Sequence, residues 1–279
     1  MSKTDSKDTR FPVPAPLKQH GPARIIAMCN QKGGVGKTTS TINLGAALAE
    51  YGRKVLLVDF DPQGALSAGL GINAYTNEPT ILDLLLTKNF QTKDVVRPTS
   101  VENLDVLPAN IDLAAAELAL VTEMNREHIL KRVLRQVADD YDVILIDCQP
   151  SLGLLTINAL TAAHGVIIPL APEFFALRAI ALLEQIMGKV RDSENNPSLK
   201  LDAILVTMYD SRTNHGREVL ERVREGFPEV TLRAMIPKTI KFSESVVHLK
   251  PITQSASDSA AAEAYRAVAR ELVQRGCTP

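Results

Sequence analysis

Apolar residues along the chain fall into short continuous runs that alternate with stretches of helical spacing. Runs that suit strands buried on both faces occur at residues 24–29, 55–58, 104–107, 143–146, 166–170, 203–206 and 230–232. Helical spacing occurs at residues 39–50, 112–138, 153–163, 176–191, 214–226 and 258–275. This alternation predicts an α/β fold with a doubly wound, mostly parallel sheet flanked by helices. Ligands bind such sheets at the carboxyl ends of the strands, so residues there are the first candidates for chemistry.

Residues 1–22 differ from the rest of the chain because they mix prolines with small and charged residues and have no apolar period. They predict a flexible tail, followed by one domain over residues 23–279. The net charge of the chain is −1, so binding to nucleic acid would need a local basic patch. The 3 cysteines are too few for a disulfide framework, and no apolar run reaches the roughly 18 residues of a membrane span. With no signal-peptide pattern at the start, the sequence predicts a cytoplasmic protein without membrane insertion.

The segment Gln31–Thr39 has the composition of a phosphate-binding loop. Glycine amides and the N-terminus of the following helix both favour an anion at this place. Lys37 and Thr38 occupy the lysine and magnesium-hydroxyl positions of the pattern G-x-x-x-x-G-K-[ST], although Gln31 stands where the pattern has glycine. Strand, loop, helix and strand then complete the βαβ unit of a P-loop NTPase. The cofactor-binding candidates in this loop are Gly33, Gly34, Val35, Gly36, Lys37, Thr38 and Thr39.

Acidic residues follow two of the predicted strands at the same edge of the sheet. We expect one of the two carboxylates, Asp59 and Asp61, to serve the structure and the other to serve the site. Asp61 is the candidate for the site, where it could orient a water or sense the γ-phosphate. Asp147 directly follows the run 143–146, which is the Walker B arrangement for holding Mg²⁺ directly or through water. The candidate magnesium ligands are therefore Thr38, Asp61 and Asp147. A solvated Asp-Pro turn at Asp61 and a helix cap at Asp147 are the structural alternatives.

Several of these segments together resemble one known family. Residues 32–39, 58–64 and 147–153 are similar to the deviant Walker A, switch I and Walker B segments of the ParA/Soj chromosome-partitioning ATPases. The similarity continues at residues 203–214 and 235–238 and covers about residues 24–275. One departure is Gln149, where many relatives have proline. The resemblance implies a P-loop ATPase of the deviant Walker A type, with ATP and Mg²⁺ as cofactors.

The resemblance also gives a role to Lys32, the second lysine of the loop. In this family the extra lysine binds the phosphates of the ATP held by the other subunit of a nucleotide-sandwich homodimer. Lys32 is therefore a further cofactor-binding and catalytic candidate, together with Lys37 for charge neutralisation and Asp61 for positioning the attacking water. Hydrolysis should be slow, because these residues include no strong general base.

By the same resemblance, the adenine base lies against the Met208 region and Pro237. The resemblance assigns contacts with nonspecific double-stranded DNA to Arg212, Lys238 and Lys241. Such contacts would be to phosphates, and hence independent of sequence and sensitive to salt. Composition alone favours ordinary solvated loops at these three positions.

The expected function is that of a dimerising, nucleoid-associated DNA-segregation ATPase. It would bind DNA in its ATP state and be reset when a ParB-type centromere-binding protein stimulates hydrolysis. The alternatives are a MinD-like spatial regulator, a nucleotide-bound scaffold with incidental hydrolysis, and a metabolic ligase. The segment 257–275 is rich in alanine, which inserts poorly into lipid and disfavours a MinD-type membrane helix.

Overall fold

The computed structural model of the chain describes residues 11–75, 78–87 and 89–279, whose strands form one seven-stranded sheet. The strand order is β3-β4-β2-β5-β1-β6-β7, and all neighbours are parallel except β3 and β4. The strands are β1 (Arg24–Met28), β2 (Val55–Phe60), β3 (Arg97–Pro98), β4 (Leu104–Leu107), β5 (Val143–Cys148), β6 (Gly165–Leu170) and β7 (Lys200–Val206). The predicted doubly wound α/β fold is confirmed.

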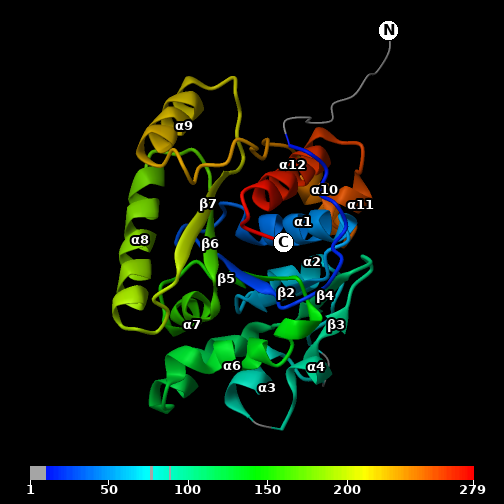
Figure 1. Cartoon of the computed structure of the whole chain (residues 1–279), viewed down its shortest axis with the longest axis vertical. Helices are drawn as coiled ribbons and strands as arrows, with labels where there is room; N and C mark the ends of the chain where they lie inside the picture. The colour runs from blue at the N-terminus through cyan, green and yellow to red at the C-terminus, as the bar shows by residue number, and fades with distance from the viewer. Residues whose placement is uncertain (1–10, 76–77, 88) are drawn as a thin grey trace.

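Helices cover both faces of this sheet (Figure 1). One face packs against α1 (Lys37–Glu50) and α12 (Ala260–Gln274), which lie side by side. The other face packs against α3 (Ile81–Leu86), α6 (Ile129–Arg135), α7 (Leu154–Ala162) and α8 (Ala176–Asp192). The remaining helices in the described residues are α2 (Ala65–Gly69), α4 (Thr92–Val95), α5 (Ala114–Ala119), α9 (Asn214–Gly226), α10 (Lys241–Val247) and α11 (Ile252–Ser255).

Successive residues of the central strands enter the two opposite cores. In β1, Ile25 and Ala27 pack in one core, whereas Ile26 and Met28 pack in the other. Strand β5 lies between β1 and β2, with Asp147 in register with Met28 on one side and with Asp59 on the other. This register brings the acidic residues to the edge of the sheet from which the loop to α1 departs.

The predicted helix over residues 112–138 is wrong. The structure divides it into α5 and α6, with 3₁₀ turns at Ile111–Leu113, Leu120–Thr122, Arg126–His128 and Ala138–Asp140. Asn125 lies between α5 and α6 with φ of 54°, in the left-handed region that a continuing α-helix of L-residues avoids.

The predicted strand over residues 230–232 is also wrong, because it forms only an isolated bridge between Thr231 and Ile204. The Leu232 amide donates to the Ile204 carbonyl, but the next amide that would face β7, that of Ala234, donates to the Glu271 carboxylate at 2.8 Å and does not continue the ladder. A side chain from the last helix thus ends this pairing.

The predicted tail lies partly outside the described residues, which begin at Phe11. Phe11 is buried in the core next to α12. His20 Nδ1 lies 2.8 Å from Asp142 Oδ2, and the Gly21 amide donates to the other oxygen of Asp142 at 2.9 Å. The described part of the segment therefore contacts the domain, and the boundary at residue 22 stays a prediction.

Candidate active site

The phosphate-binding loop joins β1 to α1 and is held by polar contacts from two other elements. Gly34 and Gly36 have φ of 72° and 82°, which only glycine adopts without strain. The buried Asn30 donates to the Pro169 carbonyl at 2.8 Å and accepts from the Lys32 amide at 3.0 Å. At the other end of the loop, Thr207 Oγ1 donates to the Val35 carbonyl at 2.8 Å. These contacts fix the loop to the ends of β6 and β7.

The N-terminus of α1 is built to accept an anion. Its N-cap residue, Gly36, provides no side chain to bond the free amides of the first turn, and no acidic residue lies in that turn. Lys37 is buried, and its Nζ donates to the Lys32 carbonyl at 3.2 Å. A phosphate in the cradle would offer the Lys37 ammonium a stronger, charge-assisted acceptor. The roles predicted for residues 33–39 stay predictions, and the features just described are those that phosphate binding requires.

Thr38 and Asp147 meet beside this cradle. Thr38 Oγ1 donates to Asp147 Oδ2 at 2.6 Å, although the two residues come from α1 and β5. Burial, and then the nearby charge of Asp59, raises the pKa of Asp147 to about 8. Mg²⁺ takes hard oxygen ligands and is commonly held by one or two protein oxygens together with phosphates and waters. A buried carboxylate paired with a hydroxyl fits that ion.

The two aspartates at the end of β2 have different surroundings. Asp59 is fully buried and accepts from the Ser67 amide at 2.8 Å and from Ser67 Oγ at 2.7 Å, and burial raises its pKa to about 7. Asp61 is partly exposed, and its carboxylate accepts only a local bond from the Gln63 amide at 3.0 Å in the described residues. Asp59 therefore anchors α2, whereas Asp61 remains accessible for the site.

Lys32 is exposed and pairs with a residue outside its own loop. Its Nζ forms an ion pair with Glu173, which follows β6, and the two side chains are 43% and 59% exposed. Phe174 and Phe175 are also exposed and contact each other edge to face, with ring centroids 5.0 Å apart. Sequence reasoning missed Glu173 because the pair joins residues 141 positions apart, and no local pattern signals it.

Met208 and Pro237 line one pocket beside the P-loop, as the resemblance implied for an adenine site. This pocket has a volume of about 300 Å³ and is also lined by Gly36, Phe242 and Tyr265. Its walls are mostly apolar, and its volume lies at the lower end of the range for small-molecule sites, roughly 300–1,000 Å³.

Two of the three predicted DNA contacts, Arg212 and Lys238, lie on loops that the structure brings together, whereas Lys241 lies in a helix. The Lys238 amide donates to the Tyr209 carbonyl at 3.1 Å, next to the Asp210–Arg212 turn, and Lys241 begins α10. Arg212 is exposed, but its guanidinium forms two hydrogen bonds to Asp210, at 2.9 and 2.7 Å, which help to lower the pKa of that carboxyl to about 2. Arg212 thus offers a partly neutralised charge, whereas Lys238 and Lys241 have no carboxylate within ion-pair distance among the described residues.

Another residue that sequence reasoning missed lies against the loop after β5. Glu117 of α5 accepts from Gln149 Nε2 at 2.8 Å. A Cβ atom at Gly153 would lie 2.1 Å from the same Glu117 oxygen, so a larger residue there would displace the end of the Glu117 side chain. Gln149, the departure from the family pattern, therefore makes a side-chain hydrogen bond that proline at this position could not make.

Comparison with known proteins agrees with this geometry. A family model described as an AAA domain matches residues 23–201. An uncharacterised protein of Mycobacterium tuberculosis is 56% identical, with 95% of this chain and 83% of that protein covered. The chromosome-partitioning ATPase Soj of Treponema pallidum is 47% identical, with 90% of this chain and 98% of that protein covered. The chain belongs to the ParA/Soj family.

The ParA/Soj assignment confirms the family predicted from residues 32–39, 58–64 and 147–153. A solved structure described as cobyrinic acid a,c-diamide synthase from Mycobacterium smegmatis, with bound ADP and magnesium, is 41% identical to this ParA/Soj-family chain. Its TM-score is 0.79, and the match covers 91% of this chain and 96% of that one. Among the residues that the structure describes, no helix has the length and apolar character needed to cross a membrane.

Proposed function

We propose that this ParA/Soj-family chain is a nucleotide-dependent switch that binds ATP with Mg²⁺ and hydrolyses it slowly. The loop amides and Lys37 bind the phosphates, Thr38 and Asp147 hold the metal ion, and the pocket at Met208 and Pro237 takes the base. The neighbouring structure with bound ADP and magnesium supports this choice of ligands. Each group contributes position or charge, which is what phosphoryl transfer requires from a protein.

The observation that carries the proposal is the different direction of the two lysines in one loop. Lys37 is buried inside the cradle, whereas Lys32 is exposed and extends outward to Glu173. An outward cation contributes little to the nucleotide of its own subunit but can bind the phosphates of a nucleotide on a second subunit. ATP therefore joins two copies of the chain, with each Lys32 acting on the other subunit.

Asp61 positions the attacking water in this dimer, because its carboxylate is accessible and sits at the end of β2 beside the magnesium pair. The dimer binds nonspecific double-stranded DNA through Lys238, Lys241 and Arg212, and the chain is then associated with the nucleoid. A ParB-type partner accelerates hydrolysis and returns the chain to its resting state. The relatives that are described as chromosome-partitioning proteins support this cycle.

A second candidate is an amide-forming synthase that uses the same nucleotide site. The name of the Mycobacterium smegmatis structure favours it. The two functions differ in what stimulates turnover, because a synthase needs an acid and an amine donor, whereas a partitioning switch responds to DNA and a partner protein. ATP turnover measured with each of these additions separates them.

The mass of the purified chain, measured by light scattering with ATP, with ADP and without nucleotide, tests the proposed switch. We expect a dimer only with ATP and Mg²⁺. The same mass under all three conditions would contradict the role of Lys32 across the interface.

A further inference from the structure

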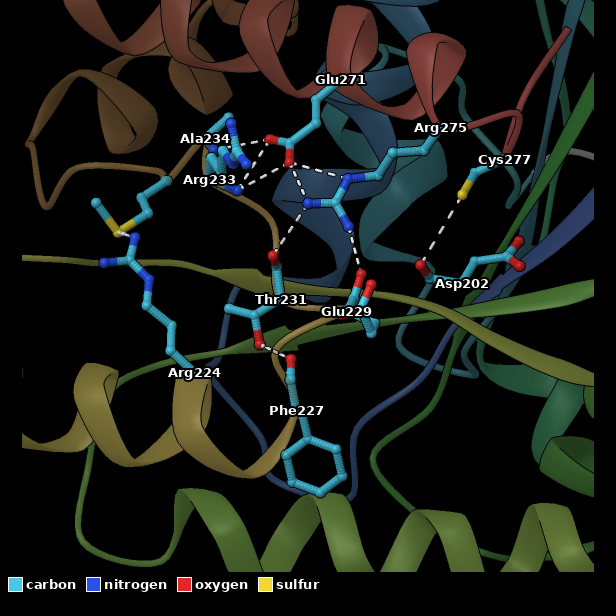
Figure 2. A network of polar contacts seen from close by, with 11 residues as sticks. Asp202, Arg224, Phe227, Glu229, Thr231, Arg233, Ala234, Glu271, Arg275 and Cys277 are labelled. Carbon is cyan, nitrogen blue, oxygen red and sulfur yellow. Dashed lines mark hydrogen bonds and ion pairs between the residues drawn. The ribbon is translucent and has the colours of Figure 1, made fainter.

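A second cleft lies at the amino end of β7, on the outer edge of the sheet. Its volume is about 990 Å³, and it shares no lining residue with the pocket at Met208. We call it the distal cleft and define it by Arg224, Glu229, Thr231, Arg233, Glu271 and Arg275. Figure 2 shows these residues converging from α9, from the loop that follows it and from the C-terminal end of α12.

Most charges of the distal cleft are already paired. Arg275 donates to Glu271 Oε1 at 3.0 Å, and to the carbonyl oxygens of Glu229 and Thr231 at 2.6 and 3.2 Å (Figure 2). The buried Glu271 also accepts the amides of Arg233 and Ala234. Asp202, at the edge of the same cleft, is bound by Arg24 at 2.7 Å. None of these groups is available to a ligand without breaking an existing contact.

The Glu229 carboxylate and the guanidinium groups of Arg224 and Arg233 are the exceptions. Both arginines are exposed, and neither has a carboxylate partner within ion-pair distance among the described residues. The contact of Arg224 that the structure shows is a 4.0 Å approach to Met235 Sδ, which is weak for a charged donor. Two planar cations therefore face the cleft, and planar guanidinium groups are well suited to bind carboxylates with two hydrogen bonds.

The surrounding groups favour a peptide over a denser anion. Glu229 lines the cleft with an exposed carboxylate, and its charge would repel the dense charge of a triphosphate or of the backbone of DNA. An extended peptide has carboxylates separated by neutral groups, and its amides and carbonyls can bond to polar side chains such as Gln274, which also lines the cleft. We propose that the distal cleft is a docking site for an acidic segment of a partner protein, bound by Arg224 and Arg233.

The contacts of Glu271 connect this cleft to the nucleotide pocket. Glu271 fixes the amides of Arg233 and Ala234, and the chain then continues to Ile236 and Pro237, which line that pocket. A carboxylate that binds the Arg233 guanidinium contacts the same segment whose backbone amides are bound to Glu271. Occupation of the distal cleft is therefore coupled to nucleotide affinity, and this coupling, unlike the docking itself, rests on the proposed nucleotide-binding function.

Fluorescence anisotropy of a labelled peptide of alternating glutamate and serine residues tests the docking site. The double variant Arg224→Glu with Arg233→Glu should bind this peptide at least roughly tenfold more weakly than the native chain, because two charge-assisted contacts become repulsive. The matched control, Arg132→Glu with Arg135→Glu, reverses two exposed arginines of α6 and should bind as the native chain does.

Equal binding by the distal-cleft variant and the native chain would overturn the proposal. If the native chain binds a peptide with glutamine in place of glutamate equally well, the proposal is also overturned. Tighter binding of inorganic tripolyphosphate or duplex DNA than of the peptide, lost in the double variant, would overturn it as well. If the double variant does not fold, hydrogen exchange on the native chain decides: the peptide should protect residues 224–234 and 271–277, and protection elsewhere would contradict the site.

Saturating peptide should also change the affinity for a fluorescent ATP analogue. If the native chain binds no nucleotide, the proposed ATPase function fails, but the anisotropy assay still tests peptide binding in the distal cleft.

Discussion

Replacing Glu173 by glutamine should strengthen dimerisation in the presence of ATP. In the resting chain Glu173 binds Lys32, the lysine that we assign to the nucleotide of the other subunit. Forming the dimer must break this ion pair before Lys32 reaches a phosphate across the interface. Glutamine keeps the size and polarity of the side chain but removes the charge that competes with the phosphate.

The exposure of the two side chains sets the magnitude of this effect. At 43% and 59% exposed, the pair belongs to the class of surface ion pairs, which contribute about 0.2–1 kcal/mol, or a factor of roughly 1.4–5 in an equilibrium constant. A symmetric dimer breaks one pair in each of its subunits, so the two factors multiply. The dimer dissociation constant should fall roughly 2-fold to 30-fold, and the change should shrink as salt screens the pair.

Sedimentation velocity over a range of protein concentrations, with Mg²⁺ and a slowly hydrolysed ATP analogue, measures this constant. Glu184→Gln is the matched control, because Glu184 pairs with Arg191 on α8 at 3.4 Å, and both residues belong to that helix. That variant should dimerise like the native chain, and with ADP all three proteins should remain monomers. A weaker dimer for Glu173→Gln would refute the reasoning, because it would mean that Glu173 makes a favourable contact in the dimer.

The other predictions concern the P-loop, switch I and the basic loops. Lys37→Ala should abolish ATP binding in calorimetry, since it removes the buried ammonium of the cradle; native affinity would exclude the assigned site. Lys32→Ala should bind ATP but fail to dimerise or hydrolyse it, and native turnover would exclude action across the interface. Asp61→Ala should accumulate the ATP-bound dimer in light scattering, so a monomer under those conditions would count against its role in hydrolysis. Arg212→Glu with Lys241→Glu should dimerise normally but lose salt-sensitive DNA retention in gel shifts, and unchanged retention would place the DNA surface elsewhere.

The sequence predicted those parts of the fold that depend on local patterns, and the candidate site residues were chosen from the same patterns. The run 143–146 indicated a buried strand, and Asp147 directly after it could be assigned without knowing its neighbours. The break around Asn125 was not predictable, because both flanking segments have helical spacing, and the interruption consists of 3₁₀ turns on either side of a residue with positive φ.

Contacts between distant residues were the other limit. Residues 230–232 look like a strand, yet their pairing stops because Glu271, about 40 positions later, takes the next two amides. Glu173 and Asn30 escaped notice for the same reason: each acts through a partner more than 130 positions away. The resemblance supplied the role of Lys32, but only the structure shows that Glu173 is its ion-pair partner in the isolated chain.

The hydrogen bond from Lys37 Nζ to the Lys32 carbonyl, at 3.2 Å, has a consequence for the order of events in the cycle. A phosphate that draws Lys37 away would take this donor from the Lys32 carbonyl, while the Lys32 amide keeps its bond to Asn30. In the proposed dimer, nucleotide binding in one subunit would thus change the contacts of the residue that this subunit offers to its neighbour. Because a productive pair needs two occupied subunits, the dimer population should follow the square of the nucleotide occupancy at low protein concentration. The loop would then convert a gradual change in the ATP to ADP ratio into a sharper change in assembly.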